Sequence, residues 1–120
     1  MKLKEVIEGD FRVDGTKEEA QRYLKKIPIL NKVTPEGQDV SLDSLERLLV
    51  NMLRKHDISM RYIMLTIIRD EVPWYSVSFK DKQSNEWIHS LYAINIYELY
   101  CKSVLYCYAL IKRGEKEKDE

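Results

Sequence analysis

The segment NIYELYCKSVLYCYALIKRG, residues 95–114, predicts a long helix with almost no polar face. On a helical wheel of about 100° per residue, its polar side chains lie within about 60° of Glu98 and form one narrow stripe: Asn95, Lys102, Lys112 and Arg113. Apart from Ser103, the rest of the wheel up to Ile111 is apolar or aromatic. We therefore expect a long closing helix that other elements cover over most of its circumference.

A second apolar patch interrupts the polar stripe of this helix. Leu105 and Ala109 lie inside the stripe, and Tyr106 lies at its edge. One sheet and one neighbouring helix do not easily cover both sides of a helix, so the patch either packs beneath an N-terminal helix or contacts another molecule. The second interpretation makes Leu105, Tyr106 and Ala109 candidate partner-binding residues, either toward a different protein or in a homodimer about a two-fold axis.

The clearest helix upstream of this segment follows Ser41 or Asp43, either of which is a suitable N-cap. Its apolar residues recur at the spacing of one buried stripe: Leu45, Leu48, Leu49, Met52 and Leu53. The side chains between them are polar and are expected in solvent: Glu46, Arg47, Asn51, Arg54 and Lys55.

An earlier helix is predicted over residues 16–27. Thr16, followed three residues later by Glu19, has the pattern of a capping box, and Pro28 is expected to end the helix. The residues before it suggest a short strand or an arm. Residues 29–40 contain Pro35 and Gly37 and are expected to be a linker in which the chain reverses.

Beyond Met60 the apolar period changes to two, which is typical of strands. Three strand-like segments follow: RYIMLTIIRD at 61–70, WYSVSFKDK at 74–82 and EWIHSLYA at 86–93. Tyr75, Val77 and Phe79 alternate with Trp74, Ser76 and Ser78, so one face of the middle strand is expected to be buried. The breaks between the segments are short enough for hairpins, which predicts an antiparallel meander.

The order of these segments predicts an α+β fold. It has an N-terminal helix, a second helix, a three-stranded antiparallel sheet and a long C-terminal helix packed on one face of the sheet. Residues 1–114 are expected to form a single domain, because 120 residues is one domain's length. The charged residues 115–120, EKEKDE, are expected to form a disordered tail.

Composition excludes some functional classes. Lys and Arg together number 20, as do Asp and Glu, so the formal net charge of +0 gives no general attraction to nucleic acids or membranes. The sequence has no apolar run near the ~20 residues of a membrane span, and its start does not resemble a signal peptide. We therefore expect a cytoplasmic protein with no membrane partner.

Cys101 and Cys107 are expected to be reduced and buried, because their spacing on one helix is too wide for a disulfide.

No motif points to catalysis or to a cofactor. A zinc site needs three or four ligands, and His56, His89, Cys101 and Cys107 do not have the local spacings of such sites. A nucleophilic Cys–His pair would require His89 to meet a cysteine in an electropositive setting, whereas both cysteines lie among apolar residues. Nucleotide-binding, phosphate-binding and hydrolase signatures are absent from the sequence. The expectation is a protein without enzymatic activity, metal or cofactor.

The exposed face of the sheet is a second candidate interface. The residues expected to share it are Trp74, Ser76 and Ser78 from one strand and Trp87, His89 and Leu91 from the next. A polar surface with two aromatic anchors is typical of protein interfaces, so Trp74, Ser76, Trp87 and His89 are candidate partner-binding residues. The alternative is that both tryptophans cover the ends of the core.

The order of one helix, three strands and one helix after residue 42 resembles the double-stranded RNA-binding domain. A nucleic-acid-binding function of that kind would use the basic side chains Arg54, Lys55, Arg61 and Lys80, with aromatic rings as stacking platforms. That family carries a basic motif at the start of its last helix, where this chain has NIYELYCK. The resemblance is therefore to the topology alone.

The segment WIHSLYAINIYELYCKSVL, residues 87–105, resembles the ending of small phage and prophage proteins with an α-β sandwich. In those proteins a strand bearing a tryptophan leads into a final helix with small residues, and the likeness covers residues 45–111. The tyrosines of this chain depart from that pattern. The resemblance implies an accessory protein that docks on and modulates a host protein, such as a defence or nucleic-acid-processing factor. We expect a non-enzymatic protein-binding module of this class, and a nucleic-acid-binding module is the alternative.

Overall fold

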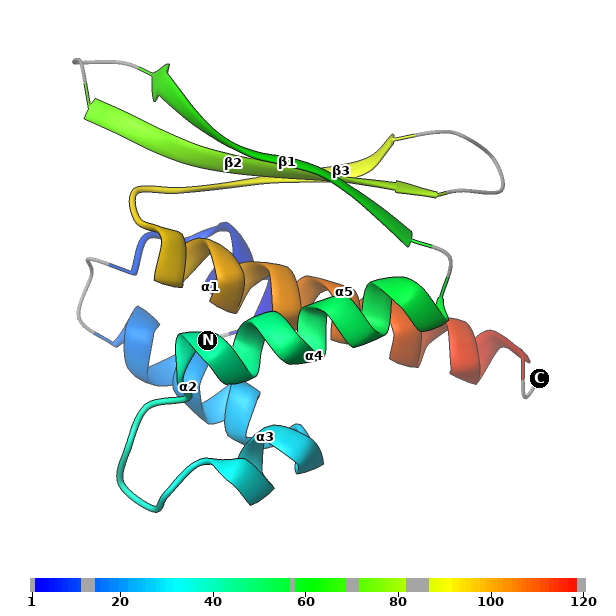
Figure 1. The fold of residues 1–120 in the computed structure, drawn as a ribbon. Helices are drawn as coiled ribbons and strands as arrows, with labels where there is room; N and C mark the ends of the chain where they lie inside the picture. Colours follow the sequence, from blue (N-terminus) through cyan, green and yellow to red (C-terminus); the bar gives the residue numbers. More distant parts are fainter. Residues whose placement is uncertain (1, 12–14, 57, 69–71, 82–86, 119–120) are drawn as a thin grey trace.

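The computed structural model describes residues 2–11, 15–56, 58–68, 72–81 and 87–118, without the side chains at 58–73, 81, 87–89 and 114–118. Its elements follow one another as α1 (Leu3–Glu8), α2 (Thr16–Lys25), α3 (Pro28–Val33), α4 (Leu42–Lys55), β1 (Ile58–Ile68), β2 (Val72–Asp81), β3 (Trp87–Ala93) and α5 (Ile96–Lys118). The expected α+β class, with an antiparallel sheet and a long C-terminal helix, is confirmed (Figure 1).

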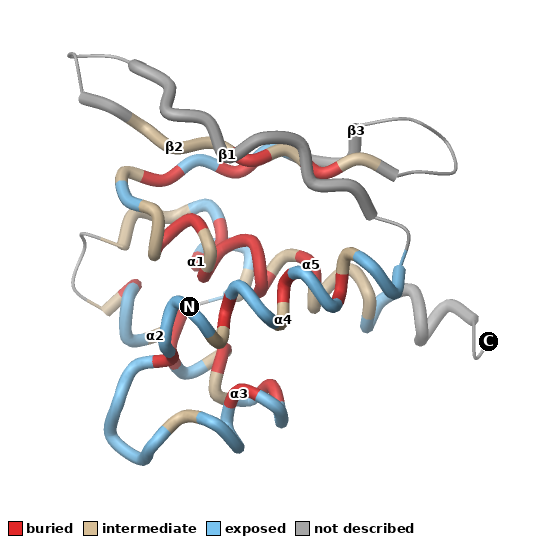
Figure 2. Tube along the Cα trace, in the orientation of Figure 1, coloured by how far each residue is buried: buried red, intermediate tan, exposed pale blue. Residues whose placement is uncertain are grey.

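The sheet forms one layer and the helices form the other (Figure 1). Its strands are ordered β1-β2-β3, and both neighbouring pairs are antiparallel. The long helix α5 runs beneath the sheet and contacts β2, β3, α1, α2 and α4. Figure 2 shows buried positions gathered along α5 and on the strands above it. The helix that the sequence predicts to be the centre of the core occupies that place.

Helix α5 is covered on both sides near Leu105, so the first of the two alternatives for its second apolar patch is the one observed, and Leu105 as a partner-binding residue is wrong. Leu105 is only 3% exposed and belongs to the buried core, so it does not form an open patch for a partner. Tyr106 is half-buried and stacks on Phe79 of β2, with 5.4 Å between ring centroids. Ala109 is also half-buried. The physical reason is that α1 and α2 both pack on α5, in addition to the sheet and α4.

The polar stripe of α5 is also buried near its start. Glu98 is 1% exposed and Lys102 is 2% exposed, and Lys102 Nζ lies 3.2 Å from Glu98 Oε1. The same carboxylate oxygen accepts a hydrogen bond of 2.9 Å from the backbone N–H of Phe11. Lys102 Nζ donates to the Tyr92 carbonyl at 3.0 Å and lies 5.6 Å from the Phe11 ring centroid. The ion pair therefore connects α5 to β3 and to the segment after α1.

A second buried polar network joins α2, the segment before α4, and α5. The Val40 N–H donates to Gln21 Oε1 at 2.9 Å, and Gln21 Nε2 donates to the Tyr97 hydroxyl at 2.7 Å. The Tyr97 hydroxyl in turn donates to the Val40 carbonyl, which closes the ring. Burial raises the pKa of Tyr97 above its ordinary value, so the hydroxyl keeps the proton that it donates.

The N-terminal third differs from the sequence-based prediction. Residues 3–8 form helix α1 rather than a strand or an arm. Helix α2 begins at Thr16 with Gly15 as its N-cap, at a φ of 94°, and no side chain caps it, so the predicted capping box is wrong. A φ in this region favours glycine, which is why the cap falls one residue before Thr16.

The predicted linker contains a further helix. Pro28 lies at the start of α3 and so begins a helix, where the sequence predicts that it only ends one. Proline fits the first helical position because its missing N–H would have no intrahelical partner there. Ser41 is the N-cap of α4, and its Oγ accepts a 3.1 Å hydrogen bond from the Ser44 N–H, as one of the two alternatives predicted.

Helix α5 extends to Lys118, into the segment predicted to be a disordered tail at 115–120. Lysine and glutamate are good helix formers, so the run EKEK can continue a helix that is already formed. The last two residues, 119–120, lie outside the described residues.

The buried ion pair has an exposed counterpart at the same spacing, which allows a matched test. Glu98→Gln leaves the Lys102 charge buried without its partner, and should lower the free energy of unfolding by about 3–5 kcal/mol. Asp43 and Arg47 form an i, i+4 pair at 3.1 Å in α4 with both side chains exposed. Asp43→Asn should cost at most about 1 kcal/mol. Urea unfolding followed by circular dichroism measures both, and equal losses would contradict the structure.

Candidate functional site

The outer face of the sheet lies opposite the helical layer (Figure 1). On β2, Val77 and Phe79 are buried, while Trp74, Ser76 and Ser78 are half-buried, as the alternation of the sequence predicts. On β3, Ser90 is exposed, and its hydroxyl lies 2.8 Å from that of Ser78 in the neighbouring strand. This face therefore presents aromatic and hydroxyl groups on the side of the sheet that points away from the helical layer.

The register of β3 corrects the residues expected on this face. Leu91 is buried and pairs with Val77, so it points to the core. Tyr92, which is 48% exposed and pairs with Ser76, takes the outer side. The sequence does not indicate Tyr92 when Trp74 and Trp87 are taken to share one face, because that choice places Leu91 outside and Tyr92 inside. The buried Leu91 and Ala93, which flank Tyr92, give the correct phase.

Two other predicted residues of this surface are placed only by their backbone. His89 pairs with Phe79, and Trp87 pairs with Lys80 beyond an irregularity in the register. The side chains of Trp87 and His89 lie outside the described residues. The structure thus brings together Trp74 and Ser76, adds Ser90 and Tyr92 to them, and leaves the prediction for Trp87 and His89 open.

A cavity of about 270 Å³ lies between the end of α1 and β3. Trp74, Ser90 and Tyr92 of the outer face line it together with Lys102 of α5 and a short stretch of chain from α1: Ile7, Glu8, Gly9 and Asp10. Leu91 completes the lining. Trp74 and Tyr92 therefore border a cavity as well as lying on the outer face of the sheet.

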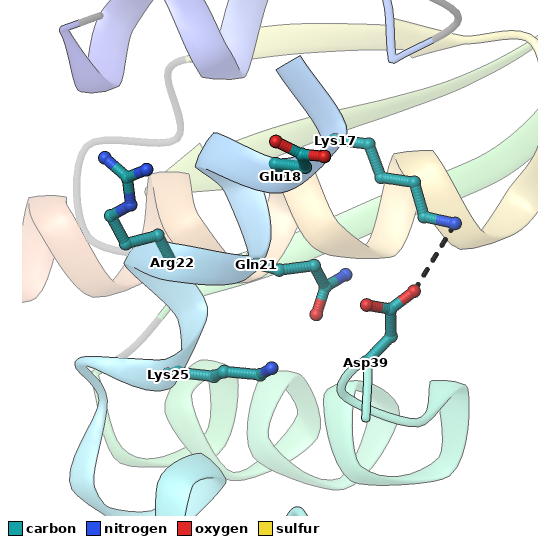
Figure 3. Close-up of a pocket in the computed structure, with 6 residues that line it drawn as sticks. All are labelled: Lys17, Glu18, Gln21, Arg22, Lys25 and Asp39. Atoms are coloured by element: carbon teal, nitrogen blue, oxygen red, sulfur yellow. Dashed lines mark ion pairs between the residues drawn. The ribbon is translucent and has the colours of Figure 1, made fainter. Parts of the chain in front are cut away.

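A larger cavity, of about 460 Å³, lies beside α2 (Figure 3). Lys17 and Asp39 form an ion pair of 3.3 Å across it, and Gln21 and Lys25 point into it. The carbonyl oxygen and amide nitrogen of the Gln21 side chain already bond to Val40 and Tyr97. The charges of Lys17 and Asp39 neutralise each other, and the Gln21 amide already bonds to other residues of the protein. This cavity therefore has fewer groups available to bind a ligand than the cavity beside β3.

The basic residues of the nucleic-acid alternative are divided between two places. Arg54 and Lys55 are exposed at the end of α4. Lys80 lies on β2, half-buried, and Arg61 lies on β1, where its side chain is outside the described residues. Arg61 pairs with Ser78, so the backbones of Arg61 and Lys80 lie on neighbouring strands.

The described residues give no metal centre. No three histidine, cysteine or acidic side chains come together among them in a way that could hold a metal ion. Burial raises the pKa of both thiols, Cys101 and Cys107, to about 12, which opposes formation of a reactive thiolate. Within the described part of the chain, no helix is both long enough and apolar enough to span a membrane.

Comparison of this chain with family models, with curated proteins and with solved structures found no match in any of the three.

The raised thiol pKa predicts resistance to alkylation. At about pH 8 the thiolate fraction of Cys101 and Cys107 should be far lower in the folded protein than in the unfolded chain, because burial raises the pKa of both thiols to about 12. Iodoacetamide should therefore modify the native protein far more slowly than the protein in concentrated urea, as followed by mass spectrometry.

Rapid native labelling of either cysteine would contradict the burial. The raised pKa of the two thiols also makes the stability of the fold depend on pH. A raised pKa stabilises the fold fully below the ordinary thiol pKa, and this contribution is lost as pH rises toward about 12.

Proposed function

We propose that this chain is a non-enzymatic protein-binding module that uses the outer face of its sheet as the interface. The observation that carries the proposal is the group formed by Trp74, Ser76, Ser78, Ser90 and Tyr92, hereafter the sheet-face patch. It combines an exposed tyrosine and a half-buried tryptophan with hydroxyl groups, on the side opposite the helices (Figure 1). Tyrosine and tryptophan are the residues that most often dominate binding energy at protein interfaces.

We place this module in the class of small phage and prophage accessory proteins, acting in the cytoplasm on a host protein. The basis is the resemblance of residues 45–111 to such proteins, together with the lack of catalytic motifs in the sequence. In this proposal the protein modulates a host defence or nucleic-acid-processing factor by occupying its surface, and needs no cofactor to do so.

The alternative is a nucleic-acid-binding module. Arg54 and Lys55 favour it because both are exposed at one end of α4. The buried Glu98–Lys102 pair opposes it, since the one lysine near the start of α5 is neutralised and inaccessible.

The nucleic-acid alternative requires binding to duplex RNA that weakens steeply as the salt concentration rises and is lost in the double variant Arg54→Gln/Lys55→Gln. Absent or salt-insensitive binding in a filter assay would remove it.

Substitutions on the sheet-face patch should abolish partner binding without unfolding the protein. Trp74→Ala and Tyr92→Ala each remove an aromatic anchor, which typically costs more than about 2 kcal/mol of binding energy at an interface. Val33→Ala, at a 54% exposed apolar residue of α3, is the matched control on the other layer. Tagged variants are compared by affinity capture from nuclease-treated host lysate and mass spectrometry, with circular dichroism to check the fold.

The same host protein should be retained by the unsubstituted chain and by Val33→Ala, and lost from both aromatic variants. Retention by the folded aromatic variants at the level of the control would contradict the proposed interface.

A further inference from the structure

The cavity beside β3 has the dimensions of a site for one large side chain. Its volume of about 270 Å³ is below the range of about 300–1,000 Å³ that is usual for cofactor and drug-sized ligands. It opens where the sheet-face patch ends, because Trp74, Ser90 and Tyr92 belong to both. A partner that lies on the outer face is therefore positioned to insert a side chain into it.

The charges around the cavity favour a cation. Lys102 is the one basic residue of the lining, and its ammonium group already contacts Glu98 at 3.2 Å and the Tyr92 carbonyl at 3.0 Å. Its charge is thus compensated inside the protein and is not offered to an anion. Among the acidic residues of the lining, Glu8 is exposed at the end of α1, so its carboxylate faces solvent at the edge of the cavity.

Aromatic rings beside a carboxylate recognise a guanidinium group well. Cations are attracted to the faces of tryptophan and tyrosine, and arginine is the side chain that most often makes this contact in proteins. The planar guanidinium also stacks on an aromatic ring while it bonds to a carboxylate with two N–H groups. Trp74 and Tyr92 supply the aromatic component here, and Glu8 supplies the carboxylate.

We propose that this cavity binds an arginine side chain of the protein partner, held by Trp74, Tyr92 and Glu8. The proposal rests on the proposed function, since it takes the partner to be a protein lying on the sheet-face patch. It adds the chemistry of that partner: a surface arginine, projecting far enough to reach between α1 and β3.

The test titrates the whole chain, labelled with ¹⁵N, with the peptide acetyl-Gly-Arg-Gly-amide and follows amide and indole resonances. The control peptide carries citrulline, which has nearly the shape of arginine and no charge. The arginine peptide should shift the Trp74 indole N–H and the amides of Glu8, Ser90 and Tyr92, and the citrulline peptide should not. Equal shifts with both peptides, or shifts confined to the cavity beside α2, would overturn the proposal.

Two variants and a matched control complete the experiment. Glu8→Gln should weaken binding of the arginine peptide about threefold, and Trp74→Ala about tenfold. Glu36→Gln removes one negative charge from an exposed residue outside the cavity and should leave the binding unchanged. If Glu36→Gln weakened binding as much as Glu8→Gln, the effect would come from the net charge of the protein and not from a carboxylate in the cavity. That result would overturn the proposed arginine site.

Failure of this inference is distinguishable from failure of the proposed function. If the arginine peptide does not bind while Trp74→Ala and Tyr92→Ala still lose the captured protein, the sheet-face patch stands and the arginine site is wrong. If neither binding is observed, both are wrong.

Discussion

The ion pair between Glu98 and Lys102 is the interaction on which the arrangement of the molecule depends. Helix α5 is apolar around most of its circumference, and this pair neutralises the charges of its polar stripe near the start of the helix. Neighbouring elements can then pack on all sides, and the pair itself bonds to Phe11 and to the Tyr92 carbonyl of β3. Because the helices are used to cover α5, the outer face of the sheet is left free of them (Figure 1).

Much of the architecture could be predicted from periodicity. The stripe of Leu45, Leu49 and Met52 in α4 and the alternation around Val77 in β2 are both buried as expected, because amphipathic spacing records which side of an element faces the core. Ser41 is also predictable as an N-cap, because a serine hydroxyl at that position can accept a hydrogen bond from a backbone N–H of the first turn. Amphipathic spacing and N-cap residues depend only on neighbouring residues in the chain, so they can be recognised in one sequence without a structure.

The remaining differences arise where tertiary contacts override local signals. Nothing in the sequence shows that Glu98 and Lys102 would be buried together, since the same spacing in Asp43 and Arg47 gives an exposed pair. Leu105 is covered because α1 and α2 pack on α5, and α1 is a short helix with little sequence signal. The outer face of β3 carries Tyr92 where the sequence predicts Leu91, because the phase of a short strand is weakly specified.

The first half of α5 is enclosed by its neighbours, and the sheet-face patch lies on the opposite side of the sheet. Hydroxyl-radical footprinting of the intact chain, read by mass spectrometry, tests both features in one experiment. Tyr92 should be oxidised rapidly, whereas Cys101 and Cys107 should be protected although thiols are inherently easy to oxidise. Oxidation of both cysteines at the rate of an unfolded chain, with Tyr92 protected, would show that α5 is not enclosed and that the outer face of β3 is not accessible.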